Sequence, residues 1–165
     1  MPFEARYHEQ VSLLVSLLPF LNDEPCFALK GGTAINLFMQ QLPRLSVDID
    51  LAYLPLEPRD EALRRCRKAL QRLAETFSVR LPGVRAELQD NRRDELRILV
   101  RRGRSQVKVE VSPVLRGTLH PPHERDVVEA VEDVYGLLLY CKHFVWSRLR
   151  YDCLRVFGLS NDAVF

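Results

Sequence analysis

Two segments of the chain alternate strictly between apolar and polar side chains, which limits how each of them can fold. Residues 47–51 read VDIDL, and residues 106–112 read QVKVEVS. Successive side chains of a β-strand point to opposite faces of the sheet, so each segment is predicted to be a strand with one buried apolar face. Asp48 and Asp50 then share the polar face of one strand, and Glu110 lies on the polar face of the other.

A glycine turn precedes the first of these strands. An apolar run of strand length ends at Lys30, and Gly31 and Gly32 follow it. Glycine has no Cβ and tolerates positive φ, so backbone N–H groups in such a turn can approach a phosphate closely. Thr33 is the expected N-cap of a helix over residues 34–41, and a helix N-terminus favours negative charge. The turn is therefore predicted to bind the phosphates of a nucleotide.

The paired aspartates indicate a metal site. Two carboxylates that point to one spot destabilise each other unless a cation lies between them, and Mg²⁺ takes carboxylate oxygen while leaving room for phosphates. A third acid would allow two ions, one activating an attacking hydroxyl and one neutralising the leaving pyrophosphate. Glu110 is the best candidate for this third acid. Asp48, Asp50 and Glu110 are therefore the expected catalytic and metal-binding residues.

Each of these residues also has an ordinary structural alternative. Asp48 and Asp50 alone would be unremarkable exposed acids of a strand. Glu110 has the alternative of pairing with Lys108 or with an arginine of a neighbouring strand. Lys30 either contacts a phosphate or ends its strand in solvent.

Taken together, the motifs resemble the AbiEii/AbiGii-type toxin nucleotidyltransferases, a branch of the DNA polymerase β-like nucleotidyltransferase superfamily. The resemblance covers roughly residues 27–117 and rests on residues 30–34, Arg44, Ser46, residues 48–51 and residues 108–113. It implies that Gly31, Gly32, Thr33 and Ser46 contact the nucleotide, with Lys30 as a further candidate beside the turn. It also implies that Asp48 and Asp50 bind divalent metal and that Glu110 completes the metal site.

The resemblance carries an expected activity. A nucleotidyltransferase of this kind would move a nucleoside monophosphate from an NTP to a hydroxyl of tRNA, of another RNA or of a protein, with Mg²⁺ as cofactor. Its biological role would be growth inhibition as the toxin of a toxin–antitoxin (abortive infection) pair, with a cognate antitoxin as partner. A metal-dependent phosphodiesterase, using the same acids with water as the nucleophile, is a more distant alternative.

The region after Asp133 departs from the family pattern. The family carries a lysine on a helix in its C-terminal half and then an Arg/Asp-rich segment that completes the nucleotide pocket. Lys142 is the candidate for that lysine, and the chain ends at Phe165. The alternative function is therefore a catalytically degenerate module of the same fold that binds RNA or a partner protein.

Arginines form two clusters that could attract a phosphate backbone. One lies on a hairpin-like segment over residues 92–108, and the other lies on a predicted helix over residues 60–78. The structural alternative for both clusters is a solvated, charge-rich surface. The net charge of +2 does not by itself indicate a nucleic-acid-binding protein.

Composition is that of a globular domain, with 47% hydrophobic and 28% charged residues among 165. The cysteines show no metal-site spacing and are expected to be reduced core thiols; they are Cys26, Cys66, Cys141 and Cys153. No secretory signal is apparent, and the apolar run over residues 134–145 is too short for a membrane span. We therefore expect a cytoplasmic protein with no membrane partner.

The predicted fold class is α/β, a nucleotidyltransferase-like mixed sheet with flanking helices. The expected helices cover residues 4–21, 34–41 and 60–78. The expected strands cover residues 26–30, 47–53, 84–88, 96–102 and 106–112, and Pro113 ends the last of them. Residues 1–119 would form the core domain, and residues 120–165 a helical C-terminal tail that begins near Glu124.

Overall fold

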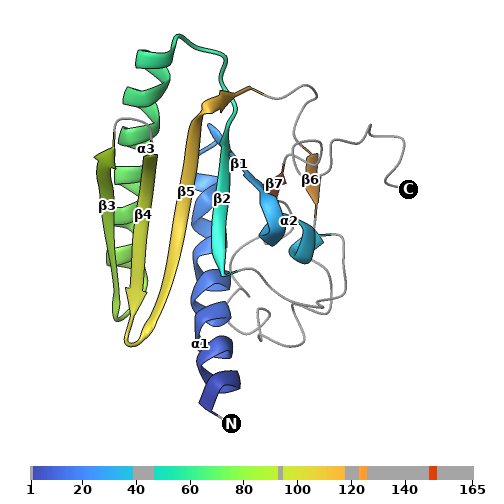
Figure 1. The fold of residues 1–165 in the computed structure, drawn as a ribbon, viewed down its shortest axis with the longest axis vertical. Helices are drawn as coiled ribbons and strands as arrows, with labels where there is room; N and C mark the ends of the chain where they lie inside the picture. The colour runs from blue at the N-terminus through green and yellow to red at the C-terminus, as the bar shows by residue number, and fades with distance from the viewer. Residues whose placement is uncertain (1, 39–46, 93–94, 118–122, 126–148, 152–165) are drawn as a thin grey trace.

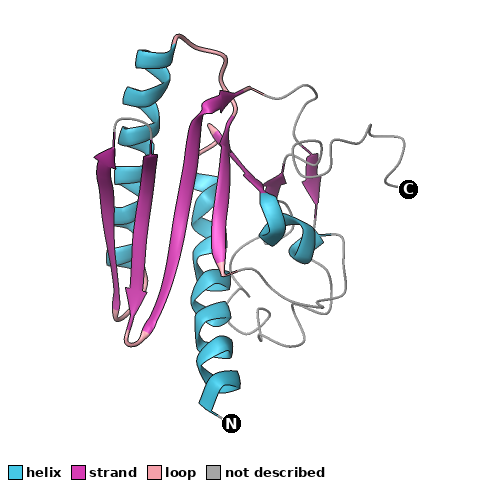
Figure 2. Cartoon of the chain, in the orientation of Figure 1, coloured by secondary structure: helices cyan, strands magenta, loops and turns pink. Residues whose placement is uncertain are grey.

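The computed structural model describes residues 2–38, 47–92, 95–117, 123–125 and 149–151. Within them the chain forms one mixed seven-stranded sheet, in the order β3-β4-β5-β2-β1-β7-β6, with helices packed on it (Figures 1 and 2). The strands are β1 (Phe27–Lys30), β2 (Asp48–Tyr53), β3 (Val84–Arg92), β4 (Glu95–Arg102), β5 (Ser105–Arg116), β6 (His123–Arg125) and β7 (Leu149–Tyr151). The predicted mixed α/β class is confirmed.

Two long helices cover the same face of this sheet. Figure 1 shows α1 (Pro2–Leu17) behind β5 and β2, and α3 (Arg59–Arg80) behind β3 and β4. The sheet-facing side of each helix is apolar and buried, with Leu14 in α1 and Leu70 and Phe77 in α3 fully covered. Burying a side chain of this size stabilises the fold by about 1.5–3 kcal/mol, so this face holds most of the core.

The strands have one apolar and one charged face, as their alternation predicts. Ile49 and Leu51 of β2, and Val107, Val109 and Val111 of β5, are buried on the helix side. The side chains between them therefore point to the opposite face, which we call the open face. In the described part of the chain, neither α1 nor α3 lies on the open face of β3, β4 and β5 (Figure 1).

The short helix α2 (Gly31–Phe38) begins directly at the end of β1, which differs from the prediction. Thr33 was expected at the N-cap and instead lies inside the helix, fully buried. Its Oγ1 donates a hydrogen bond to the carbonyl oxygen of Asp48, at 2.5 Å. The reason is the backbone of Gly31, whose φ of +78° turns the chain from strand to helix within one residue.

Two prolines act differently from expectation. Pro19 ends the first helix early, because α1 stops at Leu17 and a 3₁₀ helix, η1 (Leu18–Asp23), follows. Pro113 does not end its strand, and β5 continues to Arg116. The pairing of β2 with β5 shifts between Leu51 and Tyr53, and such an irregularity accommodates a residue that cannot donate to the ladder.

The C-terminal region also differs from the predicted helical tail where it is described. Glu124, the expected start of that tail, lies in β6, and β7 pairs with β1 in parallel and with β6 antiparallel. β6 and β7 span three residues each, which is too short for a periodic pattern to predict a strand. The remainder of residues 118–165 lies outside the described residues.

Two of the four cysteines can be placed. Cys26 is half-buried, Cys66 is buried, and both are free thiols. Burial raises the pKa of Cys26 to about 11 and that of Cys66 to about 12, so both remain protonated near neutral pH. This agrees with the expected reduced core thiols, whereas Cys141 and Cys153 lie outside the described residues.

An ion pair between the exposed Arg72 and the buried Glu24 links α3 to the segment before β1. Both carboxylate oxygens of Glu24 accept hydrogen bonds from Arg72, at 2.6 Å from Nε and 2.7 Å from Nη2, and the Glu24 side chain is only 8% exposed.

We expect Arg72→Met to lower the free energy of unfolding by about 1–2 kcal/mol, because it leaves a buried carboxylate without its partner. Urea unfolding measures this. Lys68→Met, at an exposed position of the same helix, is the control, and equal stability of the two variants would contradict the expectation.

Candidate active site

Four charged residues form one row across four neighbouring strands of the open face. Lys30 on β1 is the register partner of Asp50 on β2, which is the partner of Glu110 on β5, which is the partner of Arg97 on β4. We call these four residues the charged row. Neighbouring strands lie about 4.8 Å apart, so two carboxylates stand side by side between two cations. The structure thus brings Asp50 and Glu110 together from positions 60 residues apart in the sequence.

Asp48 lies two residues before Asp50 and faces the same side of β2. Its register partner is Lys108, whose Nζ lies 4.0 Å from Asp48 Oδ2. The backbone of Asp48 is held by the hydroxyl of Thr33, which is buried inside α2. Helix α2 therefore fixes the position at which the two aspartates enter the site.

The charges of the site repel one another at Asp50. Burial raises the pKa of Asp50, the Lys30 ammonium opposes this rise, and the nearby carboxylates of Glu110 and Asp48 add to it. Lys30 alone therefore does not compensate the negative charge that three carboxylates bring to this face. A bound cation would relieve the repulsion.

The carboxylates of Asp48, Asp50 and Glu110 are chemically suited to bind a magnesium ion. Glu110 Oε1 lies 3.6 Å from Arg97 Nη1, and the side chains of Asp48 and Glu110 are 40% and 42% exposed. Such long ion pairs at half-exposed positions leave carboxylate oxygens free to turn toward an ion, and these oxygens are the ligands that Mg²⁺ prefers. In the part of the chain that the structure describes, no three acidic, thiol or imidazole side chains are already gathered as metal ligands.

Gly31 is in contact with the carboxylate of Asp50. A Cβ added at Gly31 would lie 2.5 Å from Asp50 Oδ2, closer than real Cβ contacts allow. Only glycine therefore permits the turn to pass beside this carboxylate. The neighbouring Gly32 is exposed, so the backbone of the turn is open to solvent next to the acids.

The other predicted nucleotide contacts have different outcomes. The Thr33 hydroxyl already donates a hydrogen bond to the backbone of Asp48, so its side chain holds the aspartate strand in place. Lys30 ends its strand beside Asp50, as part of the charged row. Ser46, Arg44 and Lys142 lie outside the described residues.

Arg97 is the residue that sequence reasoning did not single out. It was counted only as one member of an arginine cluster, although the pattern of residues 96–102 places it on the polar face of its strand. Its position opposite Glu110 depends on the register between β4 and β5. The two-residue turn at Gly103 and Arg104 sets that register by pairing Arg102 with Ser105.

The two arginine clusters differ once their neighbours are known. The cluster on α3 is largely paired with acids: Arg64 and Arg65 contact Glu61, Arg67 contacts Asp90, and Arg72 contacts Glu24. On the hairpin segment, by contrast, Arg101 lies on the open face and Arg102 on the helix face, where it donates to Ser12. The helix cluster is thus a solvated ion-pair surface, whereas the strand cluster is divided between two faces.

Comparison with known proteins gives a family assignment. A family model described as "Nucleotidyl transferase AbiEii toxin, Type IV TA system" matches residues 12–143. The matched range contains the glycine turn and all three acids of the open face. Neither the curated proteins nor the solved structures gave a match.

Among the described helices, none has the length and apolar character to cross a membrane.

The contact between Gly31 and Asp50 can be tested by adding one methyl group. Gly31→Ala requires an alanine at φ +78° and also displaces the Asp50 carboxylate, whereas Gly83→Ala requires φ +72° with nothing within 4 Å. We expect Gly83→Ala to cost about 1 kcal/mol of unfolding free energy and Gly31→Ala clearly more. Urea unfolding of both variants measures the difference. Equal losses would show that the close approach to Asp50 carries no cost.

Proposed function

Because the chain belongs to the AbiEii nucleotidyltransferase family of type IV toxin–antitoxin systems, we propose that its open face transfers a nucleoside monophosphate from an NTP to a hydroxyl acceptor. The observation that carries this proposal is the pairing of Asp50 with Glu110 on adjacent parallel strands, beside the Gly31 turn. Asp48, Asp50 and Glu110 would hold Mg²⁺, which supplies charge neutralisation at the phosphates and a more acidic acceptor hydroxyl.

The chain's own residues position the nucleotide. The half-buried Gly31 and the exposed Gly32 form a turn beside the acids, and the N-terminus of α2 adds partial positive charge at the same place. Lys30 lies at the end of β1 next to Asp50, where its ammonium would bind an oxygen of the triphosphate. The turn and Lys30 therefore orient the α-phosphate toward the carboxylates.

The reaction itself is a displacement at phosphorus. The acceptor oxygen forms a bond to the α-phosphorus, the bond from that phosphorus to the oxygen bridging to the β-phosphate breaks, and pyrophosphate leaves. The hydroxyl proton is released to water. Little covalent chemistry is asked of the protein, so positioning and charge compensation by the charged row would supply most of the catalysis.

The open face supports an RNA acceptor. Arg85 on β3 and Arg101 on β4 are register partners and exposed, and Lys108 on β5 lies on the same face. With Arg97 these residues form a path of cations that leads from the acids across three strands, which we call the open-face cations. Phosphates of an RNA backbone fit such a path, because sequence-independent binding of nucleic acids comes mainly from these charges. The acceptor would be a hydroxyl of tRNA or another RNA, and growth inhibition would follow from this modification unless a cognate antitoxin opposes it.

The acids can be tested directly. We expect Asp50→Asn and Glu110→Gln each to lower nucleotide transfer by at least about 100-fold, because each removes charge at the point where phosphate charge develops. The measurement is incorporation of labelled NTP into total tRNA or protein, with and without a chelator.

Glu87→Gln serves as the matched control, since Glu87 also belongs to an open-face position of β3 but lies away from the acids. Equal transfer by the control and the Asp50 variant would reject the proposal. Salt-sensitive RNA binding without nucleotide consumption would instead favour a binding module, and loss of intact RNA without NTP would favour a phosphodiesterase.

The open-face cations make a separate expectation for RNA. The double variant Arg85→Gln, Arg101→Gln should raise the KM for tRNA while leaving kcat nearly unchanged, and should reduce the slope of log affinity against log salt by about 2. Lys68→Gln with Arg80→Gln removes the same charge from exposed positions of α3 and is the control. A loss of affinity that is equal in both double variants would show that net charge alone, rather than this face, attracts RNA.

A further inference from the structure

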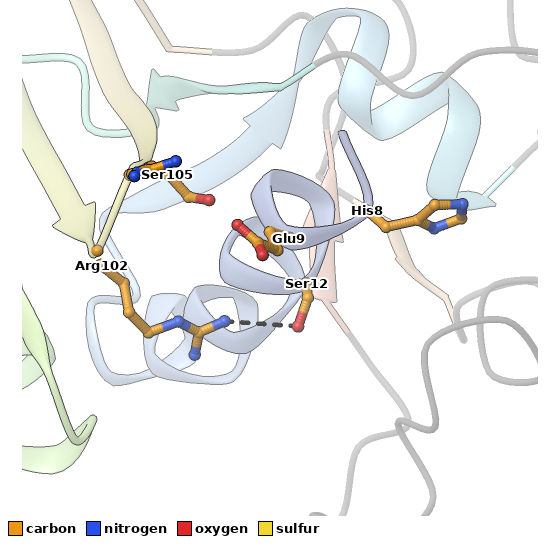
Figure 3. A pocket seen from close by; sticks show the side chains of 7 residues that line it. His8, Glu9, Ser12, Arg102 and Ser105 are labelled. Atoms are coloured by element: carbon orange, nitrogen blue, oxygen red, sulfur yellow. Dashed lines mark hydrogen bonds between the residues drawn. The ribbon is translucent and has the colours of Figure 1, made fainter. Parts of the chain in front are cut away.

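A pocket lies on the helix face of the sheet, away from the acids. It is formed between α1 and the turn that joins β4 to β5, and its volume is about 690 Å³ (Figure 3). Ser12 and Glu9 come from the helix, and Arg102, Arg104 and Ser105 from the hairpin. A cavity of this size is within the range that small-molecule ligands occupy.

The walls of this pocket are tied together by hydrogen bonds. Gln10 Nε2 donates to the carbonyl oxygen of Gln106 at 2.6 Å, and Arg102 Nη2 donates to Ser12 Oγ at 3.4 Å. The hairpin is therefore held against α1 at two points, on either side of Ser105. The pocket is a fixed feature of the packing of α1 on the sheet.

Ser105 has an unmet hydrogen-bonding requirement. Its side chain is 4% exposed, and its Oγ has no hydrogen-bond partner. Figure 3 shows this oxygen directed toward the space between the hairpin and Glu9. Buried polar atoms without partners are rare in folded proteins because each costs free energy. Because the Oγ is shielded from solvent, a ligand atom supplies the missing partner only when the Ser105 side chain rotates toward the pocket.

The charges around the pocket indicate the class of ligand. Arg102 and Arg104 place two guanidinium groups at the hairpin end. One guanidinium group can donate two parallel hydrogen bonds to two oxygens of a phosphate. Glu9 lies on the helix wall, and its carboxylate accepts hydrogen bonds but repels phosphate. A ligand that satisfies both walls therefore has a phosphate at one end and hydroxyl or amino donors at the other.

We propose that this pocket binds a nucleotide, with its phosphates at Arg102 and Arg104 and its sugar or base donors at Glu9. The site is separate from the acidic site. Ser105 and Glu110 belong to the same strand, but they differ by an odd number of positions and so face opposite sides of the sheet. Their separation along β5 is about 17 Å, at 3.3–3.4 Å per residue.

Binding can be measured without the acidic site taking part. In excess EDTA no divalent ion bridges a polyphosphate to the acids, and variants of the pocket arginines separate pocket binding from attraction by the open-face cations. The measurement is equilibrium dialysis of radiolabelled ADP with the full chain. We expect saturable binding that Arg104→Gln and Arg102→Gln each weaken by about tenfold or more. Lys68→Gln is the matched control, because Lys68 is exposed on α3 and does not line the pocket. Arg104 lies in an exposed turn, so its variant remains informative if Arg102→Gln fails to fold.

Ser105→Ala distinguishes a ligand contact from a structural role. Because the hydroxyl has no partner within the protein, its removal should leave the urea midpoint unchanged or higher while weakening ADP binding several-fold. The proposal is overturned by an absence of saturable ADP binding in EDTA, or by equal binding of the Arg104→Gln and Lys68→Gln variants. It is also overturned if inorganic phosphate displaces ADP with equal affinity, since nucleoside contacts at Glu9 would then contribute nothing. None of these results bears on transfer activity at the acids.

Discussion

The parallel pairing of β2 with β5 is the interaction on which the rest of this structure depends. It places two carboxylates beside each other, and two unit charges about 5 Å apart repel by roughly 3 kcal/mol at an effective dielectric constant of about 20. The same pairing buries Ile49, Leu51, Val109 and Val111 on the other face, at about 1.5–3 kcal/mol for each side chain. Burial exceeds repulsion, so the apolar face of the two strands holds the acids in a position that they would not adopt by themselves.

The two faces of the sheet separate two kinds of chemistry. On the open face lies the charged row of Lys30, Asp50, Glu110 and Arg97, one residue from each of four neighbouring strands. The Gly31 turn lies at its edge. On the helix face, the end of the same hairpin meets α1 and encloses the pocket around Ser105. Because neighbouring residues of a strand point to opposite sides, Arg101 and Arg102 serve different surfaces although they are adjacent in sequence.

Charge density along the chain proved to be a poor guide to surface chemistry. The arginines of α3 lie closer together in the sequence than those of the strand cluster. They nevertheless contact Glu61, Asp90 and Glu24 and form a solvated ion-pair surface. The cations of β3, β4 and β5 are spread over about 24 residues and gather only because antiparallel pairing aligns them. Pairing partners distant in sequence decide whether a cluster remains available to bind an anion, and a local pattern does not contain them.

The sequence by itself determined strands β1 to β5 and their buried faces, and it predicted which acids share one face. Strict alternation in residues 47–51 and 106–112 allows only one face to be buried, and the helical stripes of α1 and α3 follow from their spacing. Only the tertiary structure decided that Glu110 lies beside Asp50, that Arg97 completes the row, that Thr33 supports Asp48 from inside α2, and that Pro113 is tolerated within β5. Strand order and the β2–β5 register are set by packing between segments far apart in the chain, whereas the position of Arg97 opposite Glu110 follows from the short turn between β4 and β5. Local periodicity fixes which face a residue occupies but not which residue it meets there.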